Sequence, residues 1–278
     1  MKPVAFEYAR PRNIASALEL LDANPVAKIL AGGQTLGPML NLRLVQPELL
    51  IDITRIPELV AVTEGDDGIA IGACVTHAAI EDGRVSDPTN GYLGAVASGI
   101  AYRAVRTRGT IGGSLTHADP AADWLAVLLA LEAELEISGE RGARRTALDG
   151  FVKGAMETDL ESGEIVTVVH VPKSHSGARH GYHKICRKTG EFAEAIGAVV
   201  INGAEGHFKL VAAGGSHAPV VFTDPGLFFK KSDPLDAQSF DVEMGVGALR
   251  AAGMTADDYD LRLRAIAMAR AVHDAVQR

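Results

Sequence analysis

The chain has 278 residues, which is long enough for one or two domains with a substantial buried core. Hydrophobic residues make up 47% of the chain and charged residues 22%, a balance that excludes intrinsic disorder as a global description. With 27 lysines and arginines against 35 aspartates and glutamates, the formal net charge is −8. That charge argues against a protein whose main task is to coat nucleic acid or an anionic membrane.

Membrane-span, signal-peptide and cysteine patterns exclude several further classes of protein. No apolar run approaches the roughly 18 residues that a membrane span needs, and the N-terminus lacks the apolar core of a signal peptide. Cys74 and Cys186 lie far apart without a CxxC motif, so we expect no disulfide framework, zinc site or iron–sulfur cluster on this chain. We therefore expect a cytoplasmic protein whose redox or group-transfer chemistry, if it has any, comes from a bound cofactor.

The first 55 residues alternate strand and helix signals and predict a small βαβ-like unit. Asn13 is placed to cap a helix whose apolar residues follow helical spacing, and Asn24-Pro25 ends it. Strands are expected over residues 4–8, 26–31 and 49–53, and a second helix over residues 36–44.

The middle of the chain predicts a hairpin and several helices. Residues 59–64 and 68–72 flank a Gly-Asp-Asp-Gly turn, which is typical of a hairpin. Residues 121–131 are apolar on every side and indicate a buried helix, with Asp119 as its N-cap in front of Pro120. Further helices are expected over 77–81 and 93–100, and strands over 135–137 and 164–171.

The last hundred residues predict a smaller α+β domain. The polar, glycine-bearing run 173–181 marks its boundary. Strands are expected over 195–201 and 208–213. A long amphipathic helix is expected over 257–276, with Thr255 and Asp258 resembling a capping box.

Two double-glycine segments, residues 31–36 and 110–115, are the strongest candidates for a binding site. Glycines let a backbone approach a ligand closely and adopt positive φ, so that successive N–H groups surround a phosphate. The hydroxyls of Thr35, Thr110 and Ser114 add donors. Either segment alone is more simply read as a tight turn, but both together favour a clasp for a diphosphate. Metalloprotease, P-loop and serine-hydrolase motifs are absent, and the scattered histidines predict no metal site.

Four single residues could have either a functional or a purely structural role. Asp123 is placed where a carboxylate could meet a sugar hydroxyl, or merely the dipole of its helix. Lys184 belongs to a basic, strand-like run, and spacing alone favours a solvated edge. Trp124 is expected in the core, and Cys186, which lacks an activating partner, is expected to be structural.

Both glycine segments and their flanking residues resemble those of a known protein family. AGGQTLGPMLNLRL (31–44) resembles the AGGxSLxPxxxLR stretch of the flavoprotein subunits of molybdenum hydroxylases, and TIGGSLTHADPAAD (110–123) resembles their TIGGSLAxADPAAD run. These proteins are the medium subunits of carbon monoxide dehydrogenase and the FAD domain of xanthine dehydrogenase. Residues 50–53, 184–193 and 214–219 are similar to further motifs of this family.

The resemblance implies an α+β fold in two domains. Residues 1–175 would form a two-part FAD-binding domain of the PCMH type, with subdomains of about 1–55 and 56–175. Residues 176–278 would form a small α+β C-terminal domain of the CO dehydrogenase flavoprotein type.

The resemblance also implies non-covalent FAD and a set of residues that hold it. The two glycine segments would hold the diphosphate, Asp123 would meet ribityl or sugar hydroxyls, and Lys184 would lie at the cofactor. Ile100 and Val166 would be apolar flavin contacts. The implied cofactor-binding set is Ala31, Gly32, Gly33, Gln34, Thr35, Leu36, Gly37, Pro38, Ile100, Thr110, Ile111, Gly112, Gly113, Ser114, Asp123, Val166 and Lys184.

By the same resemblance, the chain would transfer electrons within a complex and have no catalytic acid or base of its own. A large molybdenum subunit and a small [2Fe–2S] subunit would carry the remaining cofactors, in a dimer of heterotrimers. One alternative is a free-standing FAD-dependent oxidase or dehydrogenase, for which His117 is the first candidate base. Another is an assembly scaffold without flavin, against which the intact glycines and hydroxyls argue.

Overall fold

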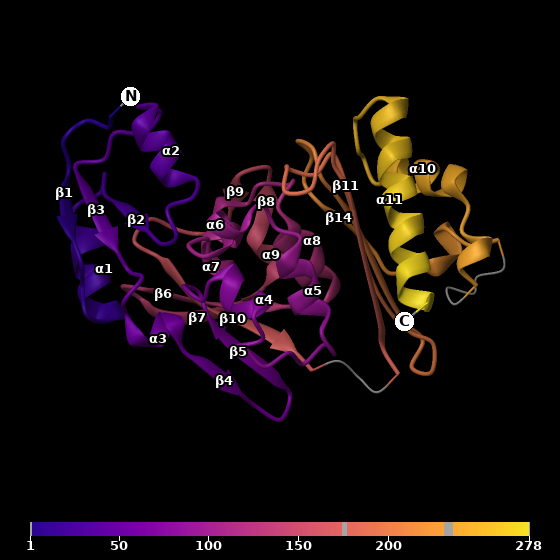
Figure 1. Cartoon of the computed structure of the whole chain (residues 1–278), viewed down its shortest axis with the longest axis horizontal. Helices are drawn as coiled ribbons and strands as arrows, with labels where there is room; N and C mark the ends of the chain where they lie inside the picture. The colour runs from indigo at the N-terminus through magenta and orange to yellow at the C-terminus, as the bar shows by residue number, and fades with distance from the viewer. Residues whose placement is uncertain (1, 174–176, 231–235, 278) are drawn as a thin grey trace.

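The computed structural model describes residues 2–173, 177–230 and 236–277, which form three main sheets with their helices along the long axis of the molecule (Figure 1). The N-terminal sheet lies at one end and the C-terminal sheet at the other. The boundary predicted at 173–181 falls in part on residues 174–176, which lie outside the described residues.

The N-terminal sheet is parallel, in the order β1 (Glu7–Ala9), β3 (Leu49–Asp52), β2 (Lys28–Leu30). It is flanked by α1 (Ile14–Ala23) and α2 (Leu36–Asn41). Asn13 caps α1 as predicted, because its Oδ1 accepts a hydrogen bond of 2.8 Å from the Ser16 amide. Parallel strands bring their carboxyl ends to one edge of a sheet, so the first glycine segment leaves β2 where β3 also ends.

The central sheet is antiparallel and has five strands. Its order is β4 (Val62–Glu64), β5 (Gly68–Gly72), β10 (Ile165–Pro172), β6 (Glu134–Gly139), β7 (Gly142–Ala147). The helices of this part are α3 (Pro57–Val60), α4 (His77–Glu81), α5 (Tyr92–Ser98), α6 (Arg103–Arg106), α7 (Ile111–His117), α8 (Asp123–Ala130) and α9 (Leu148–Phe151). A hairpin of β8 (Val152–Gly154) and β9 (Glu157–Thr158) follows α9. Every residue of α8 is buried, including Trp124 as predicted, so α8 lies at the centre of the core.

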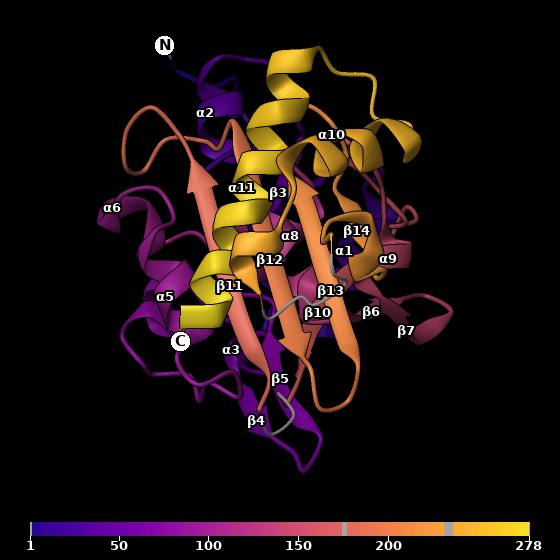
Figure 2. The ribbon, with the colours of Figure 1, turned by 90° about the vertical axis from the view of Figure 1, so that its right-hand side faces the viewer.

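The C-terminal sheet is antiparallel, in the order β11 (Arg179–Ile185), β12 (Ala195–Asn202), β13 (His207–Ala213), β14 (Val220–Phe222). Two 3-10 turns, Pro225–Leu227 and Ala237–Ser239, precede α10 (Val242–Ala251) and α11 (Asp258–Gln277). These two helices lie over one face of the sheet (Figure 2).

Both faces of β12 are covered, as the alternation of its side chains shows. Ile196 and Ala198 join the core cluster that contains α8, whereas Val199 and Ile201 join the cluster that contains α11. Helix α11 approaches the sheet closely over Gly197, where an added Cβ would lie 2.4 Å from the Ala267 carbonyl oxygen. Helix α8 is thus one of the contacts between the central and C-terminal parts of the chain.

Four local predictions are wrong. Residues 59 and 60, expected to begin a strand, end helix α3 instead, and that strand begins at Val62. Residues 110–115 do not form a loop, because residues 111–117 are helical and Thr110 caps them. The following helix begins at Asp123 instead of residue 121, since Ala118 in the left-handed conformation and the Asp119–Ala122 turn separate α7 from α8. Asp119 Oδ1 therefore caps that turn, by accepting from the Ala121 amide.

The fourth error concerns α11. Asp257, not Thr255, satisfies its first amides, because Asp257 Oδ1 accepts a hydrogen bond of 2.8 Å from the Asp260 amide. Within the described ranges no helix is long and apolar enough to cross a membrane.

Candidate cofactor site

The two glycine segments touch each other. An added Cβ at Gly32 would lie 2.2 Å from the Arg108 carbonyl oxygen, and one at Gly113 would lie 3.7 Å from the Ala31 Cβ. Only glycine fits at Gly32, since the clash there is with backbone. The fold thus brings together two segments that the sequence separates widely.

The first segment presents free backbone donors. Gly33 has a φ of +70°, which turns the chain between β2 and α2. Among the hydrogen bonds of the described chain, none is donated by the amides of Gly33, Gln34 or Thr35. Gln34 and Thr35 are exposed, so this run of amides can receive an anion from solvent. Leu36, Gly37 and Pro38 form the first turn of the helix that follows.

The second segment differs, because its amides are already bonded to protein. The Ile111 amide donates to the Val75 carbonyl (3.0 Å), and the Gly112 amide donates to the Ala73 carbonyl (2.9 Å). The Gly113 amide donates to Thr110 Oγ1 (3.1 Å), and the Ser114 amide donates to the Thr110 carbonyl (3.0 Å). The expectation of a second loop with free amides is therefore wrong. What this segment has left to offer a ligand is the partly exposed surface of Gly113 and Ser114, including the Ser114 hydroxyl.

Asp123 and Lys184 form a buried ion pair. Lys184 Nζ lies 2.7 Å from Asp123 Oδ1 and 2.8 Å from the Gly99 carbonyl oxygen. The side chains of Lys184 and Asp123 are only 10% and 9% exposed. The solvated-edge reading of Lys184 is therefore wrong: β11 carries this cation into contact with the first residue of α8.

Tyr182 joins the same pair, and sequence reasoning missed it. Its hydroxyl donates to Asp123 Oδ1. Burial and the Asp123 carboxylate raise the pKa of this phenol well above its usual value. The available signal was position, because residues two apart on a strand share a face and Tyr182 precedes Lys184 by two.

The backbone around Ile100 accepts hydrogen bonds from two cationic side chains. Arg106 donates to the carbonyls of Ile100 (2.9 Å) and Ala101 (3.1 Å) while it pairs with Glu81 at 2.8 Å. Ala101 has a φ of +44°, a left-handed conformation that is strained for a residue with a side chain. The segment that carries the predicted flavin contact is therefore fixed on both sides, by Lys184 at Gly99 and by Arg106.

Ile111 and Val166 have side chains that are buried in the hydrophobic core. Ile111 is 0% exposed and Val166 3%, and both belong to the central core. Val166 lies on β10 beside an irregularity in its pairing with β6. Protein contacts therefore occupy both side chains.

A buried histidine, His77, connects the second glycine segment to helix α8. Trp124 Nε1 donates to His77 Nδ1 at 3.0 Å, and the His77 amide donates to the Gly109 carbonyl at 2.9 Å. Burial, with a smaller effect from Arg106, lowers the pKa of His77 to about 4, so the ring is neutral near pH 7. This contact links α4, α8 and the residue that precedes Thr110.

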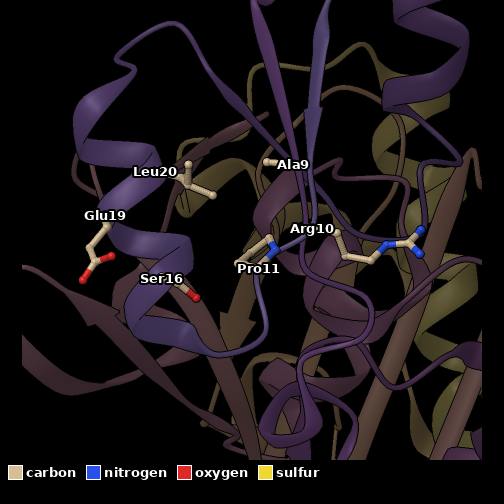
Figure 3. A pocket seen from close by; sticks show the side chains of 6 residues that line it. All are labelled: Ala9, Arg10, Pro11, Ser16, Glu19 and Leu20. Atoms are coloured by element: carbon tan, nitrogen blue, oxygen red, sulfur yellow. The ribbon is translucent and has the colours of Figure 1, made fainter.

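Two pockets of the described chain lie away from these residues. One of about 390 Å³ lies between the end of β1 and α1 and is lined by Ala9, Arg10, Pro11, Ser16, Glu19 and Leu20 (Figure 3). Another of about 360 Å³ adjoins the β4–β5 turn. Neither is lined by a predicted cofactor residue, whereas the donor groups described above have the chemistry that a diphosphate requires. Among the described residues no group of three or more His, Cys, Asp or Glu could hold a metal ion.

Comparison with known proteins identifies the family. The FAD binding domain in molybdopterin dehydrogenase matches residues 4–174. The chain belongs to this family. It is 37% identical over 218 residues to the nicotine 6-hydroxylase medium subunit of Paenarthrobacter nicotinovorans, covering 78% of this chain and 76% of that one. It is 40% identical over 202 residues to the carbon monoxide dehydrogenase medium chain of Hydrogenophaga pseudoflava, covering 72% and 70%.

The solved structures agree with the sequence relatives. Reconstituted CO dehydrogenase from Oligotropha carboxidovorans contains a chain that superposes with a TM-score of 0.87 at 30% identity, with all of both chains covered. The resemblance and the α+β fold predicted from the sequence are thereby confirmed. The protein is an FAD-binding subunit of the molybdenum hydroxylase family and a component of an oxidoreductase.

The residues present suit FAD. Free amides at Gly33 to Thr35 are donors of the kind that a diphosphate accepts, and Gly33 has the positive φ that is common in anion-binding turns. Asp123 is a buried carboxylate of the kind that accepts from a sugar or ribityl hydroxyl.

Proposed function

We propose that this FAD-binding subunit transfers electrons within a three-subunit molybdenum hydroxylase. It would receive electrons from a [2Fe–2S] subunit and pass them to an external acceptor, while a large subunit with the molybdenum cofactor oxidises the substrate. Support comes from the relatives, which are named as medium subunits or chains of hydroxylases and dehydrogenases. A dimer of such heterotrimers in the cytoplasm is the assembly that we expect.

The observation that carries the proposal is the pairing of Lys184 with Asp123 at the carbonyl of Gly99, the residue before Ile100. When bound, FAD accepts and releases electrons one or two at a time. The chain supplies position: residues 31–38 with Gly113 and Ser114 would hold the diphosphate, Asp123 would accept from a hydroxyl, and Lys184 would place a cation beside the cofactor. Ile100 remains a proposed apolar contact, whereas Val166, whose side chain is buried in the core, would contact the flavin only through its backbone.

We also propose that the site needs both parts of the chain. Residues 1–175 would form the FAD-binding domain, with subdomains of about 1–55 and 56–175. Residues 176–278 would form a C-terminal domain. Lys184 comes from the second domain and Asp123 from the first, so the predicted site would be complete only when β11 packs on α8.

Co-expression with candidate partner subunits tests the proposal. The full chain should purify with a molybdenum subunit and an iron–sulfur subunit, and adding substrate should bleach the flavin absorption only in that complex. If the isolated chain reduces its own FAD with a substrate, the free-standing enzyme is correct instead. If neither preparation binds FAD, the flavin-free scaffold is correct.

A further inference from the structure

Two donors from one strand converge on a single carboxylate oxygen. Tyr182 and Lys184 both project from β11, and both donate to Asp123 Oδ1. Asp123 itself begins α8, where its backbone is fixed by a helix that is buried along its whole length. The orientation of this carboxylate is therefore set by contacts from two parts of the chain.

The other oxygen is left unused. Within the described residues no hydrogen bond reaches Asp123 Oδ2, whereas Oδ1 has two donors. An ionised carboxylate has about four acceptor positions, so Oδ2 keeps its full capacity for a ligand.

Lys184 alone would fix the orientation of the Asp123 carboxylate poorly. Its ammonium is a point charge on a flexible stem with three rotatable donors, and here it also bonds the Gly99 carbonyl. The Tyr182 ring packs against the core, and its hydroxyl gives the Asp123 carboxylate a second, directional hydrogen bond. Because its pKa is raised well above the usual value, the phenol stays protonated and remains a donor over the neutral range.

We propose that Tyr182 is a positioning residue for FAD, which holds Asp123 Oδ1 so that Oδ2 faces a hydroxyl group of the cofactor. This inference rests on the role proposed above for Asp123. Tyr182 acts through Asp123 and does not itself need to touch the cofactor.

The test is FAD binding by the apo form of the full chain, measured by quenching of flavin fluorescence, in Tyr182→Phe and a matched control. Tyr92→Phe is the control, because Tyr92 is also buried and its hydroxyl also bonds β11, donating to the Gly181 carbonyl at 3.0 Å. Loss of a hydrogen bond to a charged group predicts a Kd about tenfold higher for Tyr182→Phe and less than about twofold higher for Tyr92→Phe. Equal effects of the two variants would overturn the proposal.

A double-mutant cycle separates positioning from packing. Asp123→Asn should weaken FAD binding, and adding Tyr182→Phe to it should weaken binding no further, because Tyr182 acts only through the carboxylate. Fully additive losses would overturn the proposal. Placing 4-aminophenylalanine at position 182 keeps a donor in the same place and should restore the affinity to within about threefold of the native value.

The outcomes distinguish this inference from the proposal beneath it. If Asp123→Asn weakens binding and Tyr182→Phe behaves like Tyr92→Phe, only the role of Tyr182 is wrong. If Asp123→Asn leaves the Kd unchanged, the role of Asp123 in the proposed site is wrong, and the role of Tyr182 is wrong with it. The thermal midpoint of each apo variant confirms that the chain is folded.

Discussion

Lys184 Nζ lies 2.7 Å from Asp123 Oδ1, although the two residues belong to different parts of the chain. The strand that carries Lys184 starts the C-terminal sheet, and the helix that begins at Asp123 is the most buried helix of the central part. Their contact joins the packing of the C-terminal sheet to the proposed cofactor site, so stability and FAD binding should respond together when it is broken.

Replacing Lys184 with methionine should leave Asp123 buried beside a neutral side chain. Breaking a buried pair by removing one partner costs about 3–5 kcal/mol, so we expect a loss of that order in the free energy of unfolding, together with weaker FAD binding. Urea unfolding and flavin titration measure the two effects. Lys209→Met is the control, because its partner Glu132 is 52% exposed. If Lys209→Met costs as much as Lys184→Met, the pair has no special role.

Replacing Gly33 with alanine forces a side chain into a φ of +70°. Such a conformation costs roughly 1–2 kcal/mol in an L-residue, and relaxing it would misalign the free amides that follow. We expect FAD binding to weaken along with stability. Gly83→Ala is the control: Gly83 has a φ of +67°, its Cβ would meet open space, and it lies outside the predicted site. It should lose similar stability but keep its FAD affinity, and a Gly33 variant that behaves in the same way would exclude the phosphate role.

Acid should destabilise the chain through His77. Its pKa is about 4 in the folded chain and near 6.5 when unfolded, so the unfolded state binds the extra proton first. The stabilisation is full above about pH 6.5 and is lost as pH falls toward 4, up to about 3 kcal/mol. Fluorescence of Trp124, the single tryptophan, reports unfolding in a pH series. His77→Asn should reduce the dependence of the free energy of unfolding on pH. An unchanged dependence would show that His77 does not cause the loss of stability in acid.

Replacing Ala101 with glycine should stabilise the apo chain. Ala101 has a φ of +44°, and glycine relieves a strain of about 1 kcal/mol there, less the entropy that glycine adds to the unfolded chain. Ala104→Gly, in an exposed helical position nearby, should instead destabilise by about 0.5–1 kcal/mol. Thermal midpoints compare the two, and a loss of stability in both variants would show that Ala101 is not strained.

Local signals predicted many of the elements well. A helix beginning at His77 was expected and is observed, and the Asn13 cap and the N-terminal βαβ-like unit were predicted from spacing and capping chemistry. Helix α7 was missed because two adjacent glycines read as a turn, whereas its amides reach the carbonyls of Val75 and Ala73 from a distant part of the chain. Long-range acceptors of that kind leave no local pattern.

The candidate site shows the same division. The resemblance selected Asp123 and Lys184 one at a time, but nothing in the sequence showed that they touch. Tyr182 was missed, since a tyrosine on a half-buried strand is common and its partner lies on another element. The difference between free amides in the first glycine segment and bonded amides in the second also depends on tertiary packing.

The most direct test of the account is flavin retention by the purified full chain. The protein is incubated with FAD, separated from free flavin by gel filtration and read by its visible spectrum, with the released cofactor identified by chromatography after acid precipitation. We predict a yellow protein that releases intact FAD, and a Lys184→Met variant that retains much less. A colourless native protein, or a Lys184→Met variant that retains FAD as well as the native chain does, would contradict a cofactor site completed by the C-terminal sheet.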